Sequence, residues 1–385
     1  MATADLAFHP LTFVTERDGT MVGRPDTGSF ALLPEDGAAL LRRLADGMPL
    51  AEAAAWYHAT YGEPVDLADF VETMRDLGFV HESGAAAEPA PVPVRFQAWG
   101  RAMFSPLGWS CYALITALAI AAMIHEPRLQ PHTRNVFFVP SLVAVEVTLA
   151  VLQMPLMLWH EGWHVLAGRR LGLPTGLGIG RRLYFVVFET RLDALFGVRP
   201  AQRHLPFLAG MLGEVVLFGV LTLAAAADLA TGPSWAGRFA LAVAYLILPR
   251  LAWQFLIFLR TDLYYVLATA LGCANLHEVG SAYLRHRLGR GRGGWAEDRW
   301  SARERALAPW FALLTAIGTA VLLVAAVFTV VLPTVTFAQR LADGIARRSL
   351  GDSRLWDAAV ALLVIVVQVV VLPLLVGRRQ RRAAA

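Results

Sequence analysis

Long apolar runs fill most of the chain after its first hundred residues. A transmembrane helix needs about 20 apolar residues, and six runs reach that length with no more than one charged residue each. Three of the runs contain one charged residue each: the second contains Glu146, the third Glu214 and the fourth Arg250. The pattern predicts an all-α polytopic membrane domain with six spans, at residues 102–124, 135–159, 205–227, 239–259, 306–339 and 358–377.

The start of the chain follows a different pattern. Between residues 10 and 33, short apolar runs are separated by Asp18-Gly19 and by Pro25-Asp26. Both pairs are turn signals, so two or three short strands are expected here. Three helices are expected next, the first from near Glu35 to Gly47, the second from Leu50 to Tyr61, and the third from an Asp66 N-cap to Gly78.

Strands followed by three helices predict a small α+β domain of the winged-helix type, separate from the membrane domain. The expected parts of the chain are a winged-helix-like domain at 1–83, a linker at 84–101, a membrane domain at 102–377 and a basic tail at 378–385.

Composition excludes a water-soluble globular protein and a disordered chain. Apolar residues make up 56% of the chain and charged residues 17%, whereas soluble domains have about 25% charged residues. Residues 1–83 carry 14 acidic residues and 5 arginines, a net charge of −9. DNA binding requires a basic face, so no nucleic-acid partner is expected. A peptide added to an exposed strand edge fits the domain better.

The arginines predict how the membrane domain is oriented. With residues 1–83 in the cytoplasm, the cytoplasmic segments after residue 83 contain 21 arginines and the outer loops contain 7. Cytoplasmic loops are normally the basic ones, so both termini are expected in the cytoplasm of a bacterial-type membrane. The first residues lack the basic and apolar runs of a signal peptide, and none is expected.

The second predicted span ends in His160-Glu161-Gly162-Trp163-His164, an HExxH motif. Helical residues four apart share a face, so both imidazoles can reach one metal ion, and the glutamate between them can act on a water molecule. Ionisable groups in a membrane helix are costly unless they are paired or functional. The motif therefore predicts a catalytic zinc site, with a metal-free descendant as the alternative.

A catalytic zinc site needs three protein ligands and one open position. Asp262 follows the fourth predicted span on the same side as the motif, and we expect it to be the third ligand; its alternative role is to cap the helix that follows. Glu214 is the rival ligand, although a pair with Arg250 is the contact we expect for it. Glu146 lies 14 residues before His160 near the same helix face and is expected to make a polar contact.

These motifs resemble the site-2 protease family of intramembrane zinc metalloproteases. The matching stretches are LWHEGWHVLAGRRLGLP and FLRTDLYYVLATALGCANL, and the resemblance covers residues 140–285. It implies Zn²⁺ as the cofactor, His160, His164 and Asp262 as its ligands, and Glu161 as the general base.

The chain departs from the family pattern at two positions. Leu263 stands where the family usually has glycine, and Glu214 falls at the asparagine of the family's GPxxN-like stretch. In residues 173–203, three glycines precede the β-prone run 183–191. The family has a hairpin near the active site in this region; a loop lying on the membrane is the alternative.

The N-terminal domain resembles the RiPP recognition element, the fold of the pyrroloquinoline-quinone peptide chaperone. The matching stretches are TGSFALLPEDGAALLRRLADGMPLAEAA and VDLADFVETMRDLGFV. The resemblance implies that the domain binds the leader of a ribosomally made precursor peptide along one strand, formed here by Ser29, Phe30, Ala31, Leu32 and Leu33. A domain that only stabilises or regulates the membrane part is the alternative.

The sequence thus predicts an intramembrane zinc metalloprotease that cleaves the leader of a precursor peptide held by its N-terminal domain. Two other functions stay open. One is a catalytically silent membrane adaptor or immunity protein that binds such a peptide. The other is a regulatory intramembrane protease that cuts a single-pass signalling protein.

Overall fold

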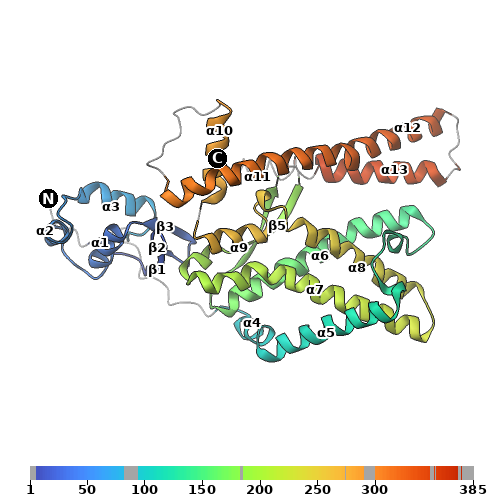
Figure 1. Cartoon of the computed structure of the whole chain (residues 1–385), viewed down its shortest axis with the longest axis horizontal. Helices are drawn as coiled ribbons and strands as arrows, with labels where there is room; N and C mark the ends of the chain where they lie inside the picture. The colour runs from blue at the N-terminus through green and yellow to red at the C-terminus, as the bar shows by residue number, and fades with distance from the viewer. Residues whose placement is uncertain are drawn as a thin grey trace.

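A computed structural model shows a mostly helical chain with a small sheet at its N-terminal end (Figure 1). Five helices are long and apolar enough to cross a membrane, which indicates a polytopic membrane protein. The residues that the structure describes are 6–81, 94–182, 185–273, 275–289, 300–346, 351, 353–371 and 374. The five helices are α5 (Pro106–His125), α6 (Leu142–Arg170), α7 (Pro200–Thr231), α8 (Trp235–Trp253) and α11 (Ala302–Ala326).

These helices correspond to the first five predicted spans. The fifth predicted span extends beyond α11, because the helix continues through a π-helical turn at Val327–Val331 into α12 (Leu332–Ala346). Where the sixth span was predicted, the described residues form α13 (Ser353–Val366) and a π-helical turn at Val367–Val371. Residues 372–373 and 375–377 of the predicted span lie outside the described residues. The described part of the chain has five candidate spans, and α13 counts there as a shorter apolar helix.

The N-terminal sheet has the strand order β1-β2-β3, with both pairs antiparallel. Three helices follow, close to the predicted bounds. Helix α2 ends at Gly62, whose φ of +77° suits glycine, and the Asp66 carboxylate accepts hydrogen bonds from the first turn of α3. The elements are β1 (Thr12–Glu16), β2 (Gly19–Arg24), β3 (Ser29–Leu33), α1 (Glu35–Ala45), α2 (Leu50–Tyr61) and α3 (Leu67–Asp76).

Both faces of this sheet are covered. Side chains alternate between the faces of a strand, and Val22 lies on the face that packs against α1 and α3 in the domain core. Val14 and Met21 lie on the opposite face, yet they are buried too. That face is covered by η3 (Asp193–Gly197), a 3₁₀ turn that leads into α7 and contacts all three strands.

The N-terminal domain therefore docks directly on the membrane domain. Glu16 at the end of β1 forms an ion pair with the buried Arg203 in the first turns of α7, at 2.5 Å. The same guanidinium donates hydrogen bonds to the carbonyls of Phe196 and Val198. The Phe30 ring of β3 contacts the Phe196 ring, with centroids 6.2 Å apart.

The segment predicted as a linker is partly helical. Its residues 97–101 belong to α4 (Gln97–Met103), which packs on α6. Gly100 permits this packing, because a Cβ atom there would collide with the Leu166 carbonyl. Residues 82–93 and the basic tail at 378–385 lie outside the described residues.

Replacing Glu16 with alanine should loosen the docked interface. The substitution leaves the Arg203 guanidinium buried without its charged partner, and breaking a buried ion pair destabilises by about 3–5 kcal/mol. We expect faster amide hydrogen exchange in β1 and η3, measured by mass spectrometry in detergent. Asp66→Ala is the control: it removes the cap of α3 and should raise exchange in that helix alone. Unchanged protection of η3 in Glu16→Ala would contradict the role given to the ion pair.

Candidate metal centre

The HExxH motif lies in the C-terminal half of α6, as the sequence predicted for a helix. His160 and His164 are one turn apart, and both are buried, with 4% and 2% of their surface exposed. Their Nε2 atoms lie 3.1 Å from each other. Together with the buried Glu161, they form a group whose candidate ligand atoms lie within 4.8 Å of one another, so the group could hold a metal ion.

Polar contacts at the other ring nitrogens explain how both histidines face one point. His164 Nδ1 lies 2.7 Å from the Pro206 carbonyl of α7 and must donate to it, since a carbonyl only accepts. His160 Nδ1 lies 3.2 Å from a carboxylate oxygen of Glu214, also in α7. With protons on both Nδ1 atoms, the lone pairs are on Nε2, the form in which a histidine binds a metal.

Helix α7 can approach the histidines this closely because it carries glycines at the contact. A Cβ atom on Gly210 would collide with Nε2 of both His160 and His164. One turn further, Gly213 lies against the Trp163 ring, and its carbonyl accepts a hydrogen bond from Trp159 Nε1 at 2.8 Å. Small residues at a helix contact allow this approach.

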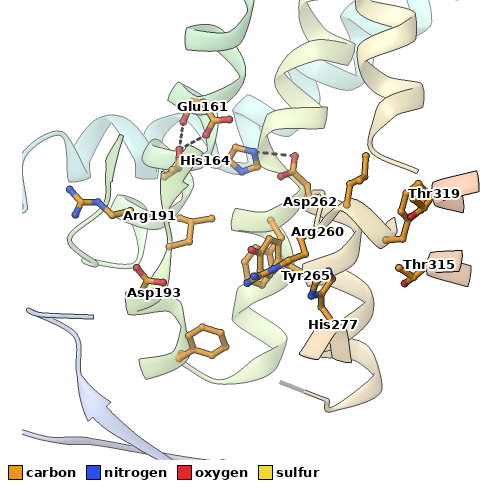
Figure 2. A pocket seen from close by; sticks show the side chains of 16 residues that line it. Glu161, His164, Arg191, Asp193, Arg260, Asp262, Tyr265, His277, Thr315 and Thr319 are labelled. Atoms are coloured by element: carbon orange, nitrogen blue, oxygen red, sulfur yellow. Dashed lines mark hydrogen bonds and ion pairs between the residues drawn. The ribbon is translucent and has the colours of Figure 1, made fainter. Parts of the chain in front are cut away.

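Asp262 completes the cluster from a second helix. Its Oδ2 atom lies 3.0 Å from His160 Nε2. The same atom lies 3.2 Å from His164 Nε2, a contact that Figure 2 draws. Asp262 is the first residue of α9 (Asp262–Leu271), and the N-cap position is taken by Thr261. The carboxylate therefore points at the histidines, and the alternative role as a helix cap does not apply.

Glu214 lies behind His160, on the side away from the point where the Nε2 atoms meet. Its Oε1 atom accepts a hydrogen bond from Arg250 Nε at 2.6 Å and also faces His160 Nδ1. The expected pair with Arg250 is thus present, and Glu214 holds the histidine instead of facing the cluster. Glu146 is not in the cluster: it lies in the first turns of α6, a helix that packs against α13, within electrostatic range of Asp357.

The cluster fits a tetrahedral metal ion. Zinc binds nitrogen and oxygen ligands at about 2.0–2.1 Å, which separates the ligand atoms of a tetrahedral site by about 3.3–3.4 Å. The three ligand-type atoms here are 3.0, 3.1 and 3.2 Å apart. Three electron-pair donors so close together repel one another unless a cation lies between them, so the residues present suit a metal.

Glu161 occupies a different position from the three ligand-type side chains. Its Oε2 atom accepts a hydrogen bond of 2.7 Å from Thr190 Oγ1, which fixes the carboxylate beside the cluster. Thr190 belongs to β5 (Phe185–Arg191), which pairs antiparallel with β4 (Gly176–Arg182). The expected hairpin is present, and one of its strands contacts the HExxH helix.

A cavity of about 710 Å³ opens beside the cluster (Figure 2). Glu161, His164 and Asp262 form part of its wall. Further lining residues come from β5, η3, α7, η4 (Ile257–Leu259), α9, α10 (Leu276–Arg287) and α11. The remaining lining residues are Thr190, Arg191, Leu192, Asp193, Phe196, Phe207, Phe258, Leu259, Arg260, Tyr265, His277, Thr315 and Thr319.

Sequence reasoning missed the residues that support this cluster. Pro206 and Gly210 act through their backbone, so their side-chain chemistry gave no signal, although GxxG spacing in an apolar helix indicates close helix packing. Gln254 was also missed: its side-chain Oε1 accepts from the Asp262 N–H at 3.1 Å, and its carbonyl accepts from Thr261 Oγ1 at 2.6 Å. Such contacts depend on chain folding and have no local pattern.

Comparison of the chain with protein-family models, with curated proteins and with solved structures found no match. The chemistry of the site is therefore argued from the geometry above.

The purified protein should contain about one firmly bound metal ion per chain. His160→Ala, His164→Ala and Asp262→Ala should each lose most of it, because each removes one of three ligand-type atoms that meet at one point. Glu146→Gln, on the same helix as the histidines but outside the cluster, is the control and should keep the metal. Elemental analysis after dialysis gives the stoichiometry. Full metal content in His164→Ala would contradict the assigned ligand set.

Proposed function

We propose that the protein is an intramembrane zinc metalloprotease that hydrolyses a peptide bond. The observation that carries this proposal is the convergence of His160, His164 and Asp262 within 3.2 Å, with the Glu161 carboxylate held beside them at a cavity. Catalytic zinc sites have three protein ligands with an open position. The resemblance to the site-2 protease family assigns the same four residues to the same roles.

A zinc ion bound by this ligand set would polarise a peptide carbonyl and lower the pKa of a water molecule. Glu161 then takes a proton from the attacking water and delivers it to the nitrogen of the departing amine. The Thr190 hydroxyl holds that carboxylate in place. Strand β5, which carries Thr190, also lines the cavity through Thr190 and Arg191, so a substrate in extended conformation can lie along it.

The N-terminal domain is proposed to hold the leader of a ribosomally made precursor peptide. Among the described strands, β3 has a neighbour on one side, and added strands bind at such an edge. With a net charge of −9, the domain favours a basic leader. The docking contacts support delivery of the bound precursor peptide to the cavity. The 3₁₀ turn η3 covers the sheet, and its residues Asp193 and Phe196 line the cavity. Both the domain and η3 are proposed to face the cytoplasm.

The docking also favours a second function, a regulatory protease in which the N-terminal domain controls access to the cavity. In that case the substrate would be a single-pass membrane protein, and leader binding would not be needed. The silent adaptor or immunity protein remains the alternative without catalysis.

Glu161→Gln should abolish cleavage while leaving the bound metal in place, because the amide cannot accept the proton and is not one of the three ligands. The test incubates the wild type and the variant in liposomes with a short precursor peptide encoded by a neighbouring reading frame, and the products are read by mass. Loss of at least a hundredfold in rate is expected, in line with general-base catalysis. A variant as active as the wild type would refute the proposed role of Glu161.

Leader dependence separates the two protease functions. At low peptide concentration, removing the leader from the precursor should slow its cleavage by the wild type at least tenfold, because the docked domain raises the local concentration of the cleavage site. Deleting residues 1–83 should reduce cleavage of the full precursor to the same level. A rise in cleavage after the deletion would instead support the regulatory protease.

A further inference from the structure

Arg260, two residues before Asp262, has an unusual backbone conformation. Its φ of +58° lies in the left-handed region, and among the described residues other than glycine only Phe96 shares this property. A residue with a Cβ atom loses about 1–2 kcal/mol there relative to ordinary conformations. Glycine would avoid the cost, so a long cationic side chain at this position needs a reason.

The surrounding turn explains how the conformation is held. Gln254 accepts two hydrogen bonds from the residues directly after Arg260, one from Thr261 Oγ1 at 2.6 Å and one from the Asp262 N–H at 3.1 Å. Gln254 and Thr261 are both buried. The contacts that aim the Asp262 carboxylate at the histidines therefore also fix the direction in which Arg260 leaves the chain.

The Arg260 side chain lines the cavity on the same wall as Asp262 (Figure 2). Its guanidinium lies beside the Tyr265 phenol, and the Tyr265 ring stacks on Phe207 with centroids 5.3 Å apart. These packed rings limit the movement of the side chain, so the cation is held in the cavity before any ligand arrives.

Unlike Arg250 and Arg203, Arg260 forms no ion pair with a described residue. Arg250 is paired with Glu214, and Arg203 is paired with Glu16. For Arg260, no described carboxylate lies within ion-pair distance; Glu278 attracts it only from further away. A guanidinium has five N–H donors in a planar fork that matches a carboxylate. Here the fork faces the cavity.

We propose that Arg260 is a specificity-determining residue that binds a carboxylate of the substrate beside the candidate metal centre. The ligand class is a peptide with an aspartate or glutamate side chain, or a C-terminal carboxylate, next to the bond at the cluster. A role for Arg260 in substrate selection rests on the proposed protease function. The binding of a carboxylate to the cavity can be tested without turnover.

The charges of the cavity agree with this assignment. With a divalent cation bound, the negative charges of Asp262 and Glu161 balance the metal, which leaves Arg260 as a cation near the cluster. Arg191 and Asp193, which also line the cavity, have opposite charges. An acidic group of the substrate therefore meets a net positive surface at Arg260.

The test measures binding to the Glu161→Gln protein in detergent, so that cleavage does not interfere. The probes are three dansyl-labelled heptapeptides of serine, alanine and leucine with one variable central residue. The first has central glutamine and an amidated C-terminus, the second has central glutamate and an amidated C-terminus, and the third has central glutamine and a free C-terminus. Fluorescence anisotropy gives the Kd of each, with zinc and after removal of metal by a chelator.

We expect the protein to bind at least one carboxylate peptide about tenfold or more tightly than the neutral peptide, as a charge-assisted hydrogen bond predicts. The second and third peptides show whether a side chain or a C-terminus is preferred. Introducing Arg260→Gly into the Glu161→Gln protein should bring the ratio of the Kd values for the neutral and carboxylate peptides close to one. Glycine adopts the same φ freely, so this variant should fold as well as its parent, and its melting temperature checks this. Adding Arg285→Gln, an exposed arginine of α10 outside the cavity wall, should leave the ratio unchanged.

Three results would overturn the proposal. The first is a Kd ratio near one in the parent protein, and the second is a ratio that survives Arg260→Gly. The third is a preference that disappears when the metal is removed, because the carboxylate would then be bound by the metal and not by Arg260. Cleavage of the same peptides by the wild type is measured separately. If the Kd ratio depends on Arg260 but no peptide is cleaved, only the proposed protease function is contradicted. If the peptides are cleaved but the Kd ratio is near one, only this inference is contradicted.

Discussion

Three electron-pair donors from two helices, α6 and α9, meet at one buried point in this protein, and the surrounding structure is arranged to keep them there. His160, His164 and Asp262 bring their Nε2 and Oδ2 atoms within 3.2 Å. In an apolar helix bundle such a cluster is unfavourable unless a cation neutralises it. The arrangement suits a bound cation, and it depends on contacts that prevent the three side chains from turning away.

Each of the three side chains has its own support. The Pro206 carbonyl fixes His164, and the Glu214–Arg250 pair lies behind His160. The turn at Gln254 fixes Asp262 and, through the same hydrogen bonds, sets the direction of Arg260. One turn of chain thus connects the candidate metal ligand with the residue proposed to select the substrate.

The N-terminal domain is connected to this site through η3. That turn packs against the second face of the β-sheet, and its Asp193 and Phe196 also line the cavity. A peptide bound at β3 would therefore lie close to the cavity through direct contact between the domains. The buried Arg203 at the start of α7 joins η3 to β1, and the same helix carries the glycine that packs on the histidines.

The sequence by itself determined the local features: the first five apolar helices, the three strands and three helices of the N-terminal domain, and the histidine pair, because each depends on residues within a few positions of one another. The tertiary structure decided which distant groups meet. It brought Asp262 to the histidines, placed Glu214 behind His160, and buried both faces of the sheet. Such contacts follow from how helices pack and where turns aim their side chains, and no periodicity in the sequence encodes them.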